Sequence, residues 1–276
     1  MKGINIDTKV RLNNGVEMPI FGLGTYQARR GKETKEAVLA ALEAGYRLVD
    51  TAAMYENEGD VGEAVRKSSI PREEIFVTTK LWNSDHGYDR TLAAFEESRQ
   101  KLGLSYVDLY LIHWPVEGLR NESWKALEKL LKEGKCRGIG VSNYMTWHLE
   151  ELFRNSSTVP AVNQVEFSPY LYQKNLLEFC RKHDIQLEAY SPLTKGHKLN
   201  DPRLDDIGSK YSKSPAQILI RWALQKEVIV IPKSSRRDRI LENADVFDFV
   251  ISGKDMKVLD SFNQDLRTSW DPSTAP

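Results

Sequence analysis

The stretch KETKEAVLAALEAGYRLVD, residues 32–50, decides the fold of this chain. Its first part places apolar residues at helical spacing and stops at Gly45, a residue typical of helix ends. Residues 47–50, Arg-Leu-Val-Asp, then form a short run typical of a strand. The stretch therefore predicts a helix followed directly by a strand. The apolar helical positions are Ala37, Val38, Ala41 and Leu42.

The same pattern continues along the rest of the chain. Helical stretches at 91–103 and 123–134 also stop at glycine, and Ser214 before Pro215 marks a further helix start. Short strand-like runs rich in β-branched residues lie between the helical stretches. We therefore predict eight strands alternating with helices, at residues 19–24, 47–50, 75–79, 107–112, 138–141, 161–165, 185–189 and 228–231.

The spacing of the strands favours a closed barrel. Successive strand ends are 22 residues (Ser142 to Gln164) to 43 residues (Tyr190 to Lys233) apart, which fits the about 30 residues of a βα unit. The longest interval leaves room for an extra helix at 203–211. An open doubly wound sheet is the alternative, but eight units without a linker favour a (β/α)8 TIM barrel, with residues 1–276 as a single domain.

A β-hairpin at residues 9–18, with its turn at 13–15, precedes the first strand and is expected at the barrel bottom.

The 39 basic and 39 acidic residues cancel, which argues against a nucleic-acid or anionic-membrane partner. Cys136 and Cys180 are far apart and are expected as reduced thiols, and no metal site is expected. Without a signal peptide or membrane span, we expect a cytoplasmic protein.

Four side chains with complementary chemistry fall at or just beyond strand ends. The carboxyl ends of barrel strands meet at one mouth, where active sites lie. Asp50, Lys80 and His113 end three strands, and Tyr55 follows the first of these by five positions. Singly, such residues are often a helix cap, a solvated lysine or a structural histidine. Together they predict an active site.

The chemistry that suits these four residues is carbonyl reduction. Hydride addition to a carbonyl leaves an alkoxide that must be protonated, and a tyrosine with a pKa of about 10 is a weak acid. A Lys80 ammonium beside Tyr55 is expected to lower the phenol pKa, with Asp50 holding the ammonium. His113 is expected to donate a hydrogen bond to the substrate oxygen.

The basic segment 232–239 follows the last strand and predicts an anion site. It carries Lys233, Arg236, Arg237 and Arg239, and barrels of this type bind phosphate after strands 7 and 8. An adenosine 2′-phosphate suits the cluster, whereas Gly22-Leu-Gly24-Thr-Tyr-Gln lacks the third glycine of a Rossmann turn. At strand ends, Tyr190 could stack on a nicotinamide ring. Ser142, Asn143 and Gln164 could bind the carboxamide of that ring.

Three long motifs resemble the signatures of one family. Residues 45–62, 130–143 and 231–243 resemble, in order, the signatures of the aldo-keto reductases. Residues 80–88 and 109–115 look closest to prokaryotic-type aldehyde and 2,5-diketo-gluconate reductases and to protozoan prostaglandin F synthases. The resemblance implies a barrel that reduces aldehydes and ketones with NADPH and acts as a monomer.

The resemblance also implies a role for individual residues. The catalytic residues would be Asp50, Tyr55, Lys80 and His113. The NADPH contacts would be Thr25, Asp50, Ser142, Asn143, Gln164, Tyr190, Ser191, Leu193, Lys233, Ser234, Ser235, Arg239, Glu242 and Asn243, with the 2′-phosphate on Lys233, Ser234 and Arg239. The substrate pocket would contain Tyr26, Tyr55, Trp82, His113 and Trp114, with Trp270 as a further candidate for its wall. Trp124, Trp147 and Trp222 are expected to pack in the core.

The short tail after Arg267 predicts an open pocket and a broad substrate range, because relatives shape the pocket with this segment.

Two other functions are alternatives to carbonyl reduction. One is an NADPH-binding redox-sensing or structural protein with little turnover, against which the intact catalytic set speaks. The other is a barrel hydrolase, which needs paired carboxylates. Glu166 and Glu188 lie inside strands and have no evident partner at the mouth.

Overall fold

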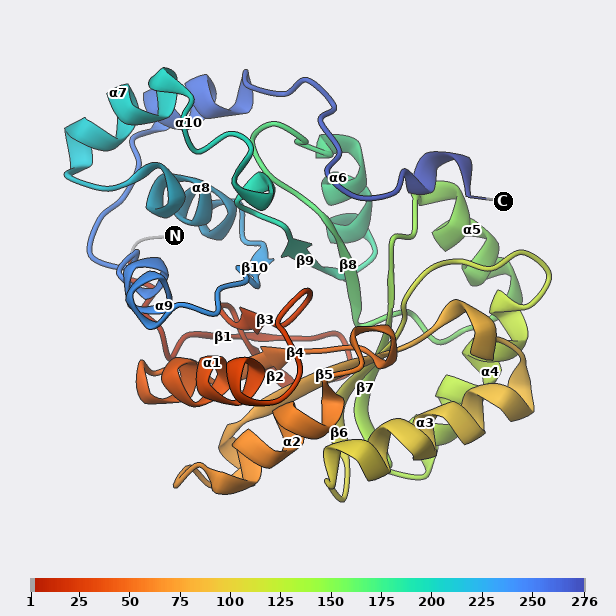
Figure 1. The fold of residues 1–276 in the computed structure, drawn as a ribbon. Helices are drawn as coiled ribbons and strands as arrows, with labels where there is room; N and C mark the ends of the chain where they lie inside the picture. Colours follow the sequence, from red (N-terminus) through yellow and green to blue (C-terminus); the bar gives the residue numbers. More distant parts are fainter. Residues whose placement is uncertain (1–2, 276) are drawn as a thin grey trace.

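The computed structural model describes residues 3–275 and contains the predicted barrel (Figure 1). Eight strands follow one another in the order β3 to β10, and every neighbouring pair is parallel. They are β3 (Leu23–Gly24), β4 (Leu48–Asp50), β5 (Phe76–Leu81), β6 (Val107–Ile112), β7 (Cys136–Ser142), β8 (Val162–Glu166), β9 (Gln186–Tyr190) and β10 (Ile229–Val230).

The first and last strands join to close the sheet. Parallel bridges link Phe21 to Val230 and Gly24 to Lys233, and the Gly22 N–H donates to the Val230 carbonyl at 2.9 Å. The backbone at position 22 lies so close to the Leu48 side chain that only glycine fits, since a Cβ there would lie 2.4 Å from it. β3 is shorter than predicted because much of the first strand pairs only through these isolated bridges.

Helices surround the strands on the outside (Figure 1). They include the predicted helices and the extra one at α7. Their bounds are α1 (Lys32–Glu43), α2 (Glu58–Lys67), α3 (Tyr88–Leu102), α4 (Arg120–Lys132), α5 (Thr146–Asn155), α6 (Lys174–Lys182), α7 (Pro202–Tyr211), α8 (Pro215–Gln225), α9 (Arg237–Ala244) and α10 (Gly253–Asp260).

Local sequence signals account for the sharpest helix boundaries. At α8, the Ser214 hydroxyl accepts from the Gln217 N–H while the Gln217 side chain accepts from the Ser214 N–H, which forms a capping box. At the end of α3, Gly103 adopts a φ of 63°, a left-handed conformation that favours glycine. The start of α8 lies at the barrel mouth, where Ser214 and Pro215 line the cavity, whereas the end of α3 leads into β6 at the opposite end of the barrel.

The predicted hairpin closes the bottom of the barrel. β1 (Lys9–Arg11) pairs with β2 (Glu17–Pro19), and Leu12 and Met18 are buried with apolar residues of the barrel strands, such as Leu48 and Phe76. The Asn14 side chain donates to the carbonyl of Arg137, near the start of β7, at 3.0 Å. The open end is therefore the one formed by the carboxyl ends of the strands.

The tryptophans that were expected in the core divide into two groups. Trp124 and Trp222 are buried, but Trp147 is 38% exposed and stacks on His148 with ring centroids 3.5 Å apart. The prediction for Trp147 was wrong because it lies on the outer face of α5, where an apolar ring can pack on a neighbouring side chain.

Two kinds of feature are absent from the described residues, a membrane-crossing helix and a group of metal-ligating side chains. No helix within residues 3–275 is long and apolar enough to cross a bilayer. The same residues contain no cluster of histidine, cysteine and carboxylate side chains arranged around a metal ion. Cys136 and Cys180 are both buried free thiols.

Candidate active site

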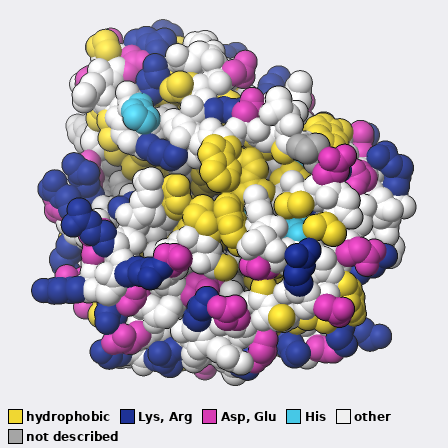
Figure 2. Space-filling model, turned by 45° about the vertical axis from the view of Figure 1, so that its right-hand side comes forward, with side chains coloured by type: hydrophobic (Ala, Val, Ile, Leu, Met, Phe, Trp, Pro, Cys, Tyr) yellow, Lys and Arg dark blue, Asp and Glu magenta, His cyan; other side chains and the backbone are white. Residues whose placement is uncertain are grey.

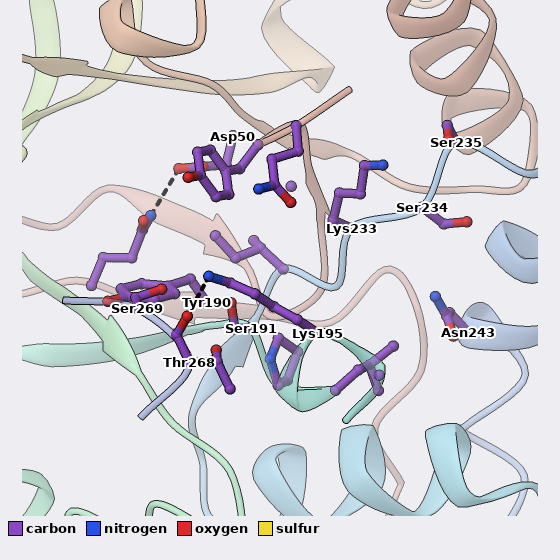
Figure 3. Close-up of a pocket in the computed structure, with 18 of the residues that line it drawn as sticks. Asp50, Tyr190, Ser191, Lys195, Lys233, Ser234, Ser235, Asn243, Thr268 and Ser269 are labelled. Carbon is purple, nitrogen blue, oxygen red and sulfur yellow. Dashed lines mark hydrogen bonds between the residues drawn. The ribbon is translucent and has the colours of Figure 1, made fainter. Parts of the chain in front are cut away.

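A cavity of about 870 Å³ lies at the carboxyl ends of the strands. Figure 2 shows hydrophobic side chains gathered in a hollow of one face. In Figure 3, Asp50 and Tyr190 lie at one end of the cavity, and Ser234, Ser235 and Asn243 lie at the other. The cavity is therefore elongated, with chemically different ends.

Lys80 lies at the centre of the candidate catalytic group. Its ammonium donates to Asp50 Oδ1 at 2.6 Å, to the Thr51 carbonyl at 3.0 Å and to Tyr55 Oη at 3.3 Å. These three bonds use all three hydrogens of the ammonium. Lys80 and Asp50 are almost completely buried. The structure thus brings three of the four predicted residues into one chain of hydrogen bonds.

The phenol of Tyr55 differs from the prediction in its acidity. Burial raises the pKa of Tyr55 well above 10, and the charge of Asp50 adds to the effect. Burial outweighs the lowering expected from Lys80, whose ammonium is paired with Asp50 so that much of its charge is compensated. Tyr55 therefore keeps its proton at neutral pH, which is the state that a proton donor needs.

His113 completes the group from the end of β6. Its ring lies 5.6 Å from the Tyr55 ring, and burial lowers the pKa of His113 well below its usual 6.5, with Lys80 adding to the effect. The imidazole is thus neutral at pH 7 and has one N–H. Nδ1 is buried without a hydrogen-bond partner among the described residues, which leaves Nε2 as the nitrogen available to a ligand in the cavity.

A network of amides and hydroxyls extends the site along β7, β8 and β9. Asn143 donates to the His113 carbonyl at 2.9 Å and accepts from the Tyr190 hydroxyl at 2.8 Å. The Ser142 hydroxyl donates to the Gln164 carbonyl at 2.8 Å. All four polar residues, Ser142, Asn143, Gln164 and Tyr190, line the cavity. Tyr190 thus has its ring fixed in the wall by its own hydroxyl.

The far end of the cavity is basic, as the sequence predicts. Lys233, Arg236 and Arg239 line it, beside the N-terminus of α9. Backbone N–H groups and the helix dipole at such an end favour an anion. Arg237 points elsewhere and pairs with Glu43 of α1 at 2.6 Å. Other predicted cofactor residues also line this cavity: Ser191, Leu193, Ser234, Ser235, Glu242 and Asn243.

Three further residues named from the sequence do not line the cavity. Lys80 lies beneath it, as its contact with Tyr55 requires. Thr25 is buried, and its hydroxyl donates to the Asp50 carbonyl at 2.9 Å. Trp82 packs against His113 with ring centroids 5.2 Å apart. Of the other predicted pocket residues, Tyr26, Tyr55, His113 and Trp114 line the cavity directly.

The C-terminal tail reaches the cavity in spite of its shortness. The Glu166 carboxylate accepts from the Thr268 N–H at 2.8 Å and from the Ser269 N–H at 3.2 Å. Lys195, on the loop after β9, donates to the Thr268 carbonyl at 2.6 Å (Figure 3). These bonds place Trp270 in the cavity wall, 5.6 Å from the Trp114 ring. Trp270, a candidate for the pocket wall in the sequence, therefore lines the cavity, and the openness of the pocket stays a prediction.

Sequence reasoning missed Lys195, Thr268 and Ser269 as cavity residues, and it missed the role of Glu166 as the anchor of the tail. The one available signal was Glu166 itself, since an acidic residue in a buried strand needs hydrogen-bond donors. Its donors are about a hundred residues away in the sequence, so only the folded chain identifies them.

Fold and site together define a class: a (β/α)8-barrel enzyme with a buried tyrosine–lysine–aspartate group beside an elongated cavity that has a basic end. Comparison with known proteins identifies the family. The model of the Aldo/keto reductase family matches residues 20–264. The chain therefore belongs to the aldo/keto reductase family.

Individual relatives cover almost the whole chain. A glyoxal reductase of Bacillus subtilis is 52% identical over 95% of this chain and 95% of its own. A 9,11-endoperoxide prostaglandin H2 reductase of Trypanosoma cruzi is 51% identical over 95% of this chain and 94% of its own. An aldo-keto reductase of Bombyx mori, solved in complex with NADP, superposes with a TM-score of 0.89 at 36% identity, over 96% and 95% of the two chains. The predicted resemblance to bacterial and protozoan members is confirmed.

Proposed function

We propose that this protein reduces aldehydes and ketones to alcohols with NADPH, and that Tyr55 supplies the proton. The observation that carries the proposal is the position of the Tyr55 hydroxyl, 3.3 Å from a Lys80 ammonium that is paired with Asp50, in the same cavity as His113. The reductase names of its relatives and the NADP complex of the Bombyx mori enzyme support it.

The residues of the cavity fit NADPH along its length. Lys233, Ser234 and Arg239 would hold the adenosine 2′-phosphate at the basic end. Ser191 and Leu193 also line the cavity and would contact the pyrophosphate, and Glu242 and Asn243 would contact the adenine. Ser142, Asn143 and Gln164 would bind the carboxamide, with the Tyr190 ring beneath the nicotinamide. Bound NADPH supplies the hydride.

Side chains of this protein would transfer the proton and stabilise the charges that result. Tyr55 Oη holds a proton that it transfers to the carbonyl oxygen as negative charge develops there. Lys80 then stabilises the phenolate that remains, since its ammonium already contacts that oxygen. His113, being neutral, donates from Nε2 to the same substrate oxygen and fixes its position.

The remaining parts of the proposal concern the protein as a whole. We infer that residues 1–276 act as one domain and as a cytoplasmic monomer; the continuous sheet supports the first, and the buried free thiols fit a reducing compartment. The balanced charge gives no reason to expect nucleic acid as a partner. The alternative of a redox-sensing or structural protein with little turnover has no observation in its favour, whereas the complete catalytic group opposes it.

The test of the function is NADPH oxidation by purified protein with a reactive aldehyde such as methylglyoxal. We expect turnover that is faster with NADPH than with NADH. Arg239→Ala should raise the KM for NADPH by about 10-fold or more, since a hydrogen bond between charged groups contributes about 1.5–3 kcal/mol. The KM for NADH, which lacks the 2′-phosphate, should change little.

Arg237→Ala is the matched control for this test, because the Arg237 side chain pairs with Glu43 outside the cavity. It should leave both KM values unchanged. An equal loss of NADPH and NADH affinity in Arg239→Ala would show that the 2′-phosphate lies elsewhere. Tight NADPH binding without turnover on a broad carbonyl panel would favour the redox-sensing alternative.

The aromatic wall of the cavity leads to a prediction about substrates. Trp270 is 64% exposed and packs near Trp114 at the mouth of the cavity. Trp270→Ala should raise the KM for phenylglyoxal by about 10-fold, because an aromatic contact and its buried area contribute about 1.5 kcal/mol. The KM for methylglyoxal, which has no ring, should change much less. Steady-state kinetics with both substrates would check this, and equal changes would refute a role of Trp270 in substrate binding.

A further inference from the structure

Glu188 is a buried acid in the barrel interior to which the proposed mechanism gives no role. It lies on β9 and is completely buried. The Gln164 amide nitrogen donates to Glu188 Oε2 at 2.9 Å and to Asp50 Oδ2 at 2.8 Å. The two hydrogens of one amide group therefore serve two carboxyl groups, one of which belongs to the catalytic group.

Glu188 has much less compensation for a negative charge than Asp50 has. Asp50 receives the Lys80 ammonium at 2.6 Å as well as the Gln164 amide. Glu188 receives only the neutral amide, and its Oε1 has no partner within residues 3–275. Lys80 has no hydrogen left for it, since all three are used on other oxygens. An ionised Glu188 would thus be a buried charge without a partner, which is costly.

The surroundings of Glu188 hold few groups that could change this balance. Its register partners on the neighbouring strands are Gln164 and Ile229, neither of which titrates. The charges that act on it come from Asp50 on β4 and Lys80 on β5. Burial raises the pKa of Glu188 from 4.5 to about 8; Asp50 adds to the rise, and Gln164 and Lys80 oppose it. The carboxyl is therefore neutral at pH 7.

We propose that Glu188 is a positioning residue whose neutral carboxyl holds the Gln164 amide between itself and Asp50, so that Lys80 and Asp50 remain the only charged pair beneath Tyr55. This inference rests on the proposed function. With both hydrogens of its side-chain amide held on carboxyl oxygens, Gln164 presents its side-chain oxygen Oε1 to a donor in the cavity, which it lines. Glu188 thus acts on the reaction through Gln164 and Asp50 and does not touch the substrate.

Ionisation of Glu188 would oppose proton transfer from Tyr55. A negative Glu188 raises the pKa of Tyr55, as Asp50 does, because both charges disfavour the phenolate. It would also add a second anion beside a single ammonium. Reduction should therefore slow as Glu188 loses its proton, and this loss should limit activity on the alkaline side.

The first test is the pH profile of kcat/KM for aldehyde reduction. The wild-type protein should lose activity as pH rises through about 8, the pKa of Glu188. Glu188→Gln keeps the acceptor oxygen and the size of the side chain but does not titrate. Its alkaline limb should move up by about one pH unit or more, with activity near pH 6 close to the wild type. An unchanged limb would overturn the inference.

Glu58→Gln is the matched control. Glu58 is also buried, accepts a hydrogen bond from Thr79 through Oε1 and has no partner for Oε2, but it is not bonded to the Asp50–Lys80 pair. The control should keep the wild-type alkaline limb. If Glu188→Gln does not fold, Glu188→Met, also uncharged and of similar size, takes its place, and its limb should shift in the same way.

The second test does not depend on activity. The pKa of Glu188 is higher in the folded than in the unfolded chain, so the folded state holds an extra proton between pH 4.5 and about 8. The stability of the wild type relative to Glu188→Gln should therefore be greatest below pH 4.5 and fall until about pH 8. Urea midpoints of the two proteins across this range measure the difference.

A constant difference between these midpoints would show that Glu188 is not protonated in the folded protein and would overturn the inference. Absence of NADPH-dependent turnover in the wild type would instead contradict the proposed function. In that case the urea midpoints still decide whether Glu188 holds its proton, so the two failures can be distinguished.

Discussion

Replacement of Tyr55 by phenylalanine should lower kcat for aldehyde reduction by about 10²–10⁴-fold, the usual contribution of a positioned general acid. The change removes only the hydroxyl that contacts Lys80 at 3.3 Å and leaves the ring against His113. The KM for NADPH should stay near its wild-type value, because the phenol is not among the residues assigned to the cofactor. Single-turnover kinetics and NADPH titration by fluorescence would measure the two quantities separately.

A matched control for this variant is Tyr106→Phe. Tyr106 stands just before β6, at the opposite end of the barrel, where its ring packs under the Arg72 guanidinium. Loss of that hydroxyl should leave kcat unchanged. A Tyr55→Phe protein with wild-type kcat would show that another group donates the proton, and it would remove the basis of the proposed mechanism.

Replacement of Lys80 by methionine should produce the largest loss of stability among the variants considered. The ammonium is completely buried and paired with Asp50 at 2.6 Å. Removing one partner of a buried pair costs about 3–5 kcal/mol, because the other charge remains without compensation. Reduction should also be lost, since Tyr55 would have no cation beside its phenolate. Urea unfolding and the aldehyde assay would measure the two effects.

The pH dependence of this variant has a definite sign. Burial already raises the pKa of Asp50, and Lys80 and Gln164 oppose the rise. Without Lys80 the pKa of Asp50 rises further, so the folded variant holds a proton that the unfolded chain releases. Lys80→Met should therefore lose stability, relative to the wild type, as pH increases from acid to neutral.

Two further variants distinguish the effect of the buried Lys80–Asp50 pair on stability from its effect on activity. The double variant Lys80→Met/Asp50→Leu, with both charges removed, should recover much of the stability and none of the activity. Lys125→Met removes an exposed ammonium that pairs with Glu122 and should change the stability little, because solvent screens this pair. A Lys80→Met protein as stable as Lys125→Met would contradict the buried ion pair.

Most of the fold could be predicted because its signals are local. The helix at residues 32–43 and the strand at 48–50 follow from the spacing of apolar residues over a few turns and from the glycine that ends the helix. The short first strand was harder, since Leu23–Gly24 depends on bridges to a strand some two hundred residues later.

The candidate site was predictable to the extent that its residues stand at strand ends. Asp50, Lys80 and His113 could be placed together because parallel strands of one barrel end at one mouth. Their electrostatics could not, since burial outweighs the effect of a compensated ammonium on Tyr55. The hydrogen bonds by which Glu166 anchors the tail depend on the path of the tail, which no periodicity describes.

By itself, the sequence determined the barrel, the family and the four residues of the candidate catalytic group, because hydrophobic periodicity, strand spacing and long motifs are properties of neighbouring residues. Only the tertiary structure decided that burial raises the pKa of Tyr55 further, that Glu166 anchors the tail and that Glu188 shares an amide with Asp50. Each of these depends on burial and on contacts between distant segments, and the degree of burial sets the cost of a charge.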